Sequence, residues 1–272
     1  MIKLICCDLD GTLLNAKKEI TEENKKVIKE FVSLGGHFVV ATGRPLMGVL
    51  NIIKELNLLS ETDATLTYNG GVIMKNKNRE IIAKTTIDGK TVKEVYKESL
   101  RLGTYFHFFA SDNTLYTTEP NEYTAVEERI NNIKAKVIDI NDINDSDEFI
   151  KCMMVGDKDV LDEAKENLRP ELKRLAIVRS SNIFLEFQNK NVSKGNGLKF
   201  LRDYYGLAKD ETMAFGDEEN DLSMIKEAHI GIAMSNGTTL VKSSANFITL
   251  DNESSGVAYA INKFILKNDA NN

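Results

Sequence analysis

The sequence predicts an α/β protein whose core is a doubly wound, Rossmann-like parallel sheet with an inserted α+β cap domain. Apolar strands alternate with amphipathic helices over the first 60 residues, a pattern typical of parallel sheets covered by helices. The alternation stops in a segment of mixed strands and helices and returns from Ser193 onward. We therefore expect a core domain formed by 1–84 and 189–272, with an α/β cap domain inserted at 85–188.

The first strand and helix have clear boundary signals. The largely apolar run at 3–7 predicts a strand buried on both faces. Thr21 is a suitable N-cap, because acidic residues fill the turn after it and apolar side chains then recur at helical spacing. Gly35 and Gly36 end this pattern, so a complete helix is expected between the two signals.

A second strand and helix are expected next, followed by three short strands. The strand is expected at 37–41, and Pro45 marks the start of a helix whose apolar stripe runs to Leu56. Beyond it, short apolar runs separated by Asn-Gly-Gly and other polar turns predict antiparallel strands. These strands are expected at 66–68, 72–74 and 80–83.

The remaining elements are expected from apolar periodicity. In the cap we expect helices near 90–102, 122–132 and 159–168, and strands at 105–109, 115–118, 149–155 and 184–187. In the returning core we expect a helix through Leu201, a strand at 213–215, a helix through Met224, a strand at 230–234, and a last strand and helix. The polar tail at 267–272 is expected to fray.

Composition limits the classes of function. The chain has 272 residues, and its 35 basic and 41 acidic residues give a formal net charge of −6. Binding to nucleic-acid phosphates needs clustered Lys and Arg, so no nucleic-acid partner is expected. No segment approaches the roughly 18 apolar residues of a membrane span, and the first apolar run is too short for a signal peptide. We expect a soluble cytoplasmic protein with no membrane partner, a monomer or weak homo-oligomer.

The cysteines and histidines carry little functional signal. Cys6, Cys7 and Cys152 lack CxxC spacing, which favours buried small side chains in a reducing cytoplasm over zinc binding, with a reactive thiol as the alternative. His107 lies in an aromatic strand of the cap and is either a substrate contact or a core or surface residue. The histidines at 37 and 229 are interpreted as structural.

Two groups of polar residues follow the first two expected strands. Asp8 and Asp10 directly follow the first strand, and Gly11 after them lets backbone approach a ligand. The alternative is a plain turn, since Asp-Gly is a common turn dipeptide. Thr42 and Gly43 follow the second strand, where a hydroxyl and free helix N–H groups can bind an anion. The alternative there is ordinary N-capping by Thr42.

Two further groups open expected helices in the second half. Lys194 begins a helix beside backbone N–H donors, although most lysines are solvated surface residues. Asp217, Asn220 and Asp221 follow a strand and offer the oxygen ligands that a hard cation prefers, although acids also favour helix N-termini. All four groups lie at strand ends or a helix start of one doubly wound domain. They can therefore converge on one site.

These motifs resemble, in order, those of the haloacid dehalogenase superfamily. They are Asp-x-Asp-Gly-Thr at 8–12, Thr-Gly-Arg at 42–44, Lys-Gly at 194–195 and Gly-Asp-x-x-Asn-Asp at 216–221. A cap between the second and third motifs is similar to that of the Cof-type sugar-phosphate phosphatases, as are Thr-Tyr-Asn-Gly at 67–70 and Phe-Leu-Glu-Phe at 184–187. The resemblance implies a Mg²⁺-dependent phosphatase that hydrolyses small phosphorylated metabolites such as sugar phosphates.

The resemblance also implies roles for single residues. Asp8 is the implied nucleophile that forms an aspartyl-phosphate, and Asp10 the implied general acid/base. The implied Mg²⁺ ligands are Asp8, the backbone carbonyl of Asp10 and Asp217, with Asp221 supporting them. The implied phosphate-binding groups are the Leu9 backbone N–H, Thr42, Gly43, Lys194 and Asn220.

Other functions were weighed against hydrolysis. Dehalogenases of the superfamily lack an acid at the position of Asp10 and its transport ATPases carry threonine there, which leaves phosphatase or phosphomutase chemistry. Mutases usually carry a helical cap between the first two motifs, where residues 13–38 have room for one helix only. Hydrolysis is therefore favoured, and the alternatives that remain are a phosphomutase or phosphotransferase of the same superfamily, a single-domain signalling receiver and a catalytically silent phosphosugar-binding protein.

Overall fold

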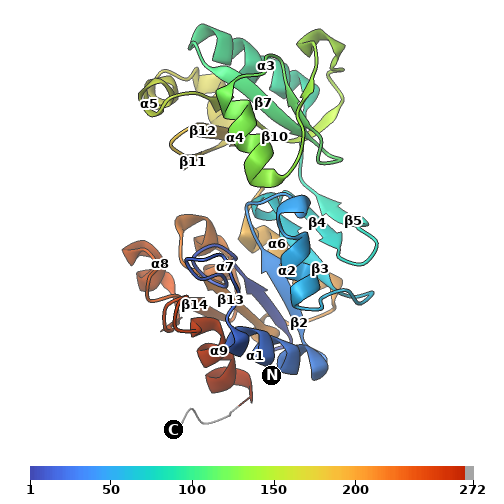
Figure 1. Ribbon diagram of the computed structural model, residues 1–272, viewed down its shortest axis with the longest axis vertical. Helices are drawn as coiled ribbons and strands as arrows, with labels where there is room; N and C mark the ends of the chain where they lie inside the picture. Colours follow the sequence, from blue (N-terminus) through green and yellow to red (C-terminus); the bar gives the residue numbers. More distant parts are fainter. Residues whose placement is uncertain (267–272) are drawn as a thin grey trace. The chain divides into compact units, whose positions relative to one another are not determined.

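The structure is a computed structural model that describes residues 1–266 and divides into two compact units (Figure 1). The core unit comprises Met1–Gly43, Val49–Ala83 and the described chain from Ser193 onward. The cap unit comprises Arg44–Gly48 and Lys84–Val192. The predicted fold class is confirmed, while the expected fraying at 267–272 concerns residues outside those described.

The core unit is built on one eight-stranded sheet with the order β15-β14-β13-β1-β2-β3-β4-β5. Strands β15 to β3 in this order run parallel, and β4 pairs antiparallel with β3. All four residues of β1 are buried, as expected of a strand covered by helices on both faces. The strands are β1 (Leu4–Cys7), β2 (His37–Ala41), β3 (Ala64–Thr67), β4 (Val72–Lys75), β5 (Ile81–Lys84), β13 (Thr212–Gly216), β14 (Ile230–Ala233) and β15 (Phe247–Ile248).

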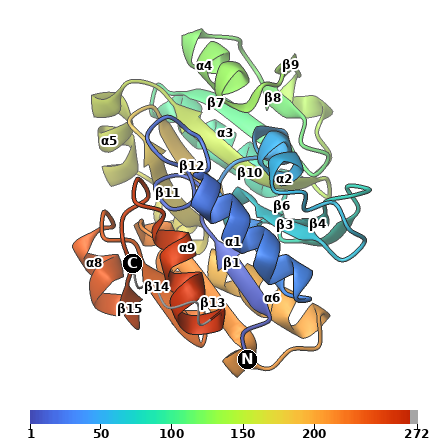
Figure 2. The same cartoon turned by 60° about the horizontal axis from the view of Figure 1, so that its bottom comes forward.

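Helices cover both faces of this sheet. On one face, Leu198 and Met224 of helices α6 and α7 pack against Leu4 and Cys6 of β1. Helices α1 and α9 lie side by side on the other face (Figure 2). The helices of the core unit are α1 (Glu22–Ser33), α2 (Leu50–Glu55), α6 (Lys194–Tyr204), α7 (Leu222–Glu227), α8 (Thr239–Ser244) and α9 (Gly256–Ile261). No helix among residues 1–266 is long and apolar enough to cross a membrane.

The signals that predict α1 act as expected. The Thr21 side chain accepts a hydrogen bond from the backbone N–H of Asn24 at 3.3 Å and so caps the helix. Gly35 follows the helix with a φ of 87°, a left-handed conformation that glycine adopts without a steric penalty. Capping and termination are local interactions, which is why the sequence predicts this helix well.

Two predicted boundaries are wrong. The helix expected from Pro45 to Leu56 is a 3-10 turn at Leu46–Gly48 followed by the short α2, and Gly48 lies where the helix would have to continue. Glycine in a helix interior costs about 1 kcal/mol relative to alanine, which favours the break. The strand expected at 66–68 ends at Thr67, because Tyr68 has a φ of 51° that no strand residue adopts.

The cap unit contains a mixed sheet with the order β11-β12-β10-β7-β8-β9, and β6 pairs with β10. One face packs against α3 and α5 through a core that includes Val95, Phe108, Leu161 and Leu185. Short strands β6 and β9 and the edge strand β11 were not predicted. The elements are β6 (Ile87–Asp88), α3 (Gly89–Arg101), β7 (Tyr105–Ala110), β8 (Leu115–Thr117), α4 (Glu122–Asn131), β9 (Lys136–Val137), β10 (Glu148–Val155), α5 (Lys158–Glu166), β11 (Ala176–Ser181) and β12 (Phe184–Gln188).

His107 of β7 lies in the interior of the cap unit. Its side chain is fully buried, and its Nε2 hydrogen-bonds the Thr124 hydroxyl of α4 at 2.8 Å. The Nδ1 atom has no hydrogen-bond partner among the described residues. Burial lowers the pKa of His107 to about 4, because the charged imidazolium is poorly solvated there.

We predict that His107 makes the cap less stable in mild acid. An unfolded histidine titrates near 6.5, so a folded pKa of about 4 means that protonation favours unfolding as the pH falls from 6.5 to 4. This residue alone should remove about 2 kcal/mol of stability between pH 7 and pH 5. Urea unfolding of wild type and His107→Gln at both pH values measures it, since glutamine does not titrate. The exposed His229→Gln control should keep the wild-type pH sensitivity, and equal sensitivity in all three proteins would contradict the prediction.

Candidate active site

The predicted site residues of the core unit gather at the carboxyl ends of neighbouring parallel strands. Asp8 follows β1, Thr42 follows β2 and Asp217 follows β13, and these three strands are adjacent in the sheet. The backbone N–H of Asp8 donates to the Phe215 carbonyl at 3.0 Å, which extends the β1–β13 ladder to the site. Parallel strands all end at one edge of a sheet, so residues far apart in sequence meet there.

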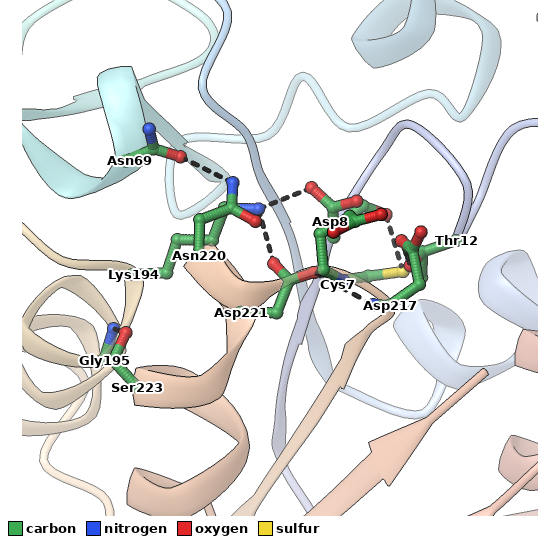
Figure 3. Close-up of polar contacts among 11 residues, drawn as sticks. Cys7, Asp8, Thr12, Asn69, Lys194, Gly195, Asp217, Asn220, Asp221 and Ser223 are labelled. Atoms are coloured by element: carbon green, nitrogen blue, oxygen red, sulfur yellow. Dashed lines mark hydrogen bonds and ion pairs between the residues drawn. The ribbon is translucent and has the colours of Figure 1, made fainter. Parts of the chain in front are cut away.

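Lys194 lies at the centre of this group (Figure 3). Its ammonium donates to Asp8 Oδ1 at 2.5 Å and to Asp221 Oδ1 at 2.6 Å, and its side chain is fully buried. Taken in isolation, a lysine at this position would be solvated, and only its convergence with the other motifs predicts a place in the site. The structure instead gives it two charged partners, as a buried ammonium requires.

The start of α6 is held so that Lys194 reaches these carboxylates. Ser193 caps the helix by accepting a hydrogen bond from the Asn196 N–H at 3.1 Å. The Gly195 N–H donates to the Ser223 hydroxyl of α7 at 2.9 Å. A Cβ at Gly195 would lie 2.5 Å from the Ser223 carbonyl oxygen, so only glycine permits this close packing of α6 on α7.

Three buried acids form the acidic side of the site. Carboxylate oxygens of Asp8, Asp217 and Asp221 all lie within 4.8 Å of one another. Thr12 donates its hydroxyl to Asp217 Oδ1 at 2.6 Å. The second Asp221 oxygen accepts the backbone N–H groups of Asp217 at 2.9 Å and Glu218 at 3.0 Å. Each acid therefore has a fixed orientation before any ligand binds.

The charged forms of these acids are destabilised. Burial, with repulsion from Asp221, raises the pKa of Asp8 to about 8, although Lys194 opposes the shift. Burial also raises the pKa of Asp217 to about 6, against the stabilising hydrogen bond from Thr12. Burial alone would lower the pKa of Lys194, but its two carboxylate partners outweigh burial and raise it. The lysine therefore stays charged, whereas in the absence of a cation Asp8 tends to hold a proton at pH 7.

This donor set fits a hard divalent cation. Carboxylate oxygens are the ligands that Mg²⁺ prefers, and when all three acids are ionised one ammonium leaves two of their three negative charges uncompensated. Gly11 has a φ of 83°, and a Cβ there would lie 2.4 Å from Asp217 Oδ2. A Cβ at Gly216 would lie 2.3 Å from the Asp221 Cβ. The two glycines thus let the backbone pass close to the acids without filling the site.

The side chain of Asp10 is not in the grouped buried acids. Its Oδ1 accepts from the Lys18 ammonium at 2.8 Å, and both side chains are partly exposed. Lys18 lies in the short loop after the Asp-Gly-Thr motif and has a φ of 64°. Sequence reasoning did not identify this lysine, because an isolated surface lysine carries no motif.

The residues expected to bind phosphate lie around the same strand ends. Leu9 and Thr42 are buried, and Thr42 accepts the backbone N–H of Asn69 at 2.9 Å through its carbonyl. Asn220 is exposed, and its Nδ2 donates to Asn69 Oδ1 at 3.1 Å. A Cβ at Gly43 would lie 3.2 Å from the same Asn69 oxygen. Asn69 thus touches this site, although its sequence was interpreted only as a turn and as part of the Thr-Tyr-Asn-Gly resemblance, with no role assigned to the residue.

Comparisons with known proteins agree with this arrangement. Residues 5–261 match the family of haloacid dehalogenase-like hydrolases. The chain is 34% identical to YxeH of Bacillus subtilis, covering 98% of this chain and 99% of that protein. It is 32% identical to YcsE of the same organism, named a 5-amino-6-(5-phospho-D-ribitylamino)uracil phosphatase, covering 97% and 96% respectively. The crystal structure of TM0651 from Thermotoga maritima is similar with a TM-score of 0.86 at 31% identity, covering 97% and 98%.

We predict that Asp8→Asn stabilises the metal-free protein. The folded pKa of Asp8, about 8, lies above the value near 4 of an unfolded aspartate, so at pH 7 ionisation favours the unfolded chain. Asparagine keeps the shape and removes this penalty, and the unfolding temperature in EDTA should rise by about 3 °C or more. Thermal unfolding followed by circular dichroism measures the change. Asp10→Asn, which removes a partly exposed carboxylate, is the control, and an unchanged or lower Asp8→Asn midpoint would contradict the prediction.

Proposed function

The chain belongs to the haloacid dehalogenase-like hydrolases, Cof-type, and from this membership we propose that it is a Mg²⁺-dependent phosphatase of small phosphorylated metabolites, most directly sugar phosphates. The family match and the named phosphatase among its relatives support a phosphatase. The observation that carries the proposal is the buried Lys194 ammonium, 2.5 Å from an oxygen of Asp8. This ammonium supports the proposal because it supplies a fixed positive charge beside Asp8, the proposed nucleophile.

The proposed reaction has two displacements at phosphorus. An Asp8 oxygen attacks the phosphoryl group, the bond to the leaving oxygen breaks, and Asp10 gives its proton to the departing alcohol. Asp10 then takes a proton from water, whose oxygen attacks the aspartyl-phosphate and releases inorganic phosphate and free Asp8. Positioning and charge neutralisation dominate phosphoryl transfer, so a rigid site with prearranged charge suits this reaction.

The remaining residues bind the ion and the phosphoryl oxygens in this proposal. Mg²⁺, when bound, supplies positive charge that neutralises the phosphoryl oxygens. Its ligands are proposed to be Asp8, the backbone carbonyl of Asp10 and Asp217, with Asp221 supporting them. The phosphoryl oxygens are proposed to accept from the Leu9 N–H, Thr42, Gly43, Lys194 and Asn220.

The substrate class is inferred from the cap and the relatives. We assign substrate specificity to the cap at 85–188, most of which belongs to a compact unit separate from the core unit. The named substrate of YcsE is a phosphorylated ribityl compound, which is small and polyhydroxylated. Three buried, free cysteines support a location in the reducing cytoplasm. Sugar phosphates and related metabolites there are the proposed substrates.

Replacing Asp8 should abolish phosphate release. Asp8→Asn removes the nucleophile, so hydrolysis of p-nitrophenyl phosphate and a panel of phosphosugars should fall by at least about 10³-fold. Asp10→Asn should instead accumulate the aspartyl-phosphate, because p-nitrophenolate leaves without a proton while water attack lacks its base. Phosphate assays and intact mass spectrometry measure the two effects.

The exposed Asp210→Asn variant is the matched control and should retain wild-type activity. Full activity of Asp8→Asn would refute the nucleophile assignment. Transfer of the phosphoryl group to a second sugar in place of water would favour the phosphotransferase alternative.

Mg²⁺ should raise the unfolding temperature through the acid cluster. A ligand at 100 times its dissociation constant stabilises the folded state by about 2.7 kcal/mol, which corresponds to roughly 5–10 °C for a chain of this size. Asp217→Asn should lose most of this shift, whereas Glu219→Gln, which removes an exposed acid from the same loop, should keep it. Thermal scans with and without Mg²⁺ test this, and an undiminished shift in Asp217→Asn would place the ion elsewhere.

A further inference from the structure

The turn after β3 has an unfavourable backbone conformation. Tyr68, Asn69 and Gly70 have φ values of 51°, 57° and 97°, three left-handed residues in succession. Glycine adopts this conformation freely and asparagine tolerates it, but a bulky tyrosine there is a genuine outlier. Such residues cost roughly 1–3 kcal/mol each and persist where the surrounding structure holds them, often at functional sites. The turn therefore calls for an explanation beyond connecting two strands.

The conformation of this turn directs Asn69 toward two segments expected to bind phosphate. Its backbone N–H donates to the Thr42 carbonyl at 2.9 Å, directly before Gly43. Its side-chain oxygen accepts from Asn220 Nδ2 at 3.1 Å (Figure 3). The amide of Asn69 also lies against Gly43, where a Cβ would be 3.2 Å from Oδ1 and 3.3 Å from Nδ2. One residue therefore contacts both the Thr-Gly segment and the Asn220 amide.

The turn is also fixed against the helix that carries Lys194. A Cβ at Gly70 would lie 2.3 Å from the Ser193 carbonyl oxygen, and one at Gly197 would lie 2.0 Å from Leu66 Cδ1. These contacts leave no room for the turn to shift without moving the start of α6. The position of Asn69 is thus set by the same packing that sets the position of Lys194.

Asn220 needs such a partner because its own surroundings do not fix it. Its side chain is exposed, and among the described residues Asn69 is the one that hydrogen-bonds its amide. A free amide would have to lose rotational freedom whenever a phosphoryl group binds. A prearranged donor avoids this loss, and misplacement by about 1 Å can cost up to 10²-fold in rate.

We propose that Asn69 is a positioning residue of the phosphoryl-binding site: it fixes the Asn220 amide and supports the Gly43 backbone. The proposal rests on the proposed function. It explains why the chain retains a left-handed Tyr-Asn-Gly turn, since a relaxed turn would withdraw the Asn69 amide from both neighbours. The residue acts through Asn220 and Gly43 and need not touch the substrate itself.

The test separates the kinetic effect of the Asn69 side-chain amide from that of the left-handed backbone conformation. Asn69→Gly keeps the left-handed turn and deletes the amide. With p-nitrophenyl phosphate as the probe, kcat/KM should fall on the order of tenfold, the inhibition constant of inorganic phosphate should rise similarly, and kcat should change less. The unfolding temperature should not fall, because glycine relieves strain at this φ.

Asn57→Gly is the matched control for this substitution. Asn57 has a φ of 55° and is exposed outside the site, so the same change there should leave kcat/KM at the wild-type value. In the Asn220→Ala background, Asn69→Gly should add little further loss, since the amide it holds is gone. Wild-type kinetics in Asn69→Gly, or losses that multiply in the double variant, would overturn the proposal.

A second double-mutant cycle pairs Asn69 with Gly43 and tests whether Asn69 supports the Gly43 backbone. Gly43→Ala presses a methyl group on the Asn69 amide and should weaken phosphate inhibition, whereas Gly43→Ala combined with Asn69→Gly should be no worse than Asn69→Gly alone. Multiplying losses in this cycle would mean that Asn69 does not support the Gly43 backbone. If wild type itself releases no phosphate from any probe, the proposed function fails instead, and the two failures are distinguished.

Discussion

The burial of one ammonium among carboxylates is the interaction on which the site depends. Lys194 is fully buried, and its charge is tolerable only because Asp8 and Asp221 lie at hydrogen-bond distance. The dependence is mutual, since those two acids would otherwise repel one another in a medium of low dielectric constant. Displacement of the ammonium would leave the ionised acids uncompensated. The ends of β1 and β13 and the start of α6 must therefore hold fixed positions relative to one another.

The backbone meets this requirement with close packing at a few glycines. The three charged residues at 8, 194 and 221 are far apart in sequence, and only the parallel sheet brings their elements to one edge. Gly195 lets α6 contact α7 through the backbone, and Gly216 does the same for the loop that carries Asp221. A Cβ at either position would fall within 2.5 Å of a neighbouring atom. Glycine is therefore required because the neighbouring segments lie so close, and not because the chain must be flexible there. The need to hold the charged residues close together thus accounts for glycine at positions 195 and 216.

Much of this was predictable from sequence because it follows from local signals and strand ends. The caps at Thr21 and Ser193 and the acid motifs after β1 and β13 each contain their own evidence within a few residues. What depends on tertiary contact could not be predicted. Lys18, the partner of Asp10, carries no motif, and the Thr-Tyr-Asn-Gly motif does not by itself indicate that Asn69 hydrogen-bonds Asn220. The break at Gly48 was missed for a different reason, because the helix-propensity penalty of one glycine is small beside the helical apolar pattern of the whole segment.

In the proposed function, the charge balance of the site also sets the order in which the cation and the phosphate ester bind. When all three are ionised, Asp8, Asp217 and Asp221 against Lys194 leave two uncompensated negative charges, and burial disfavours the ionised forms of Asp8 and Asp217. A phosphate dianion entering this site alone would meet repulsion that backbone N–H donors cannot offset. A divalent cation held by the acids would bring the local charge to zero, and the N–H groups and Lys194 could then attract the phosphoryl oxygens of the proposed substrate. The overall charge of −6 on the chain thus does not oppose a small phosphate ester, because the local balance at the strand ends decides whether the anion binds.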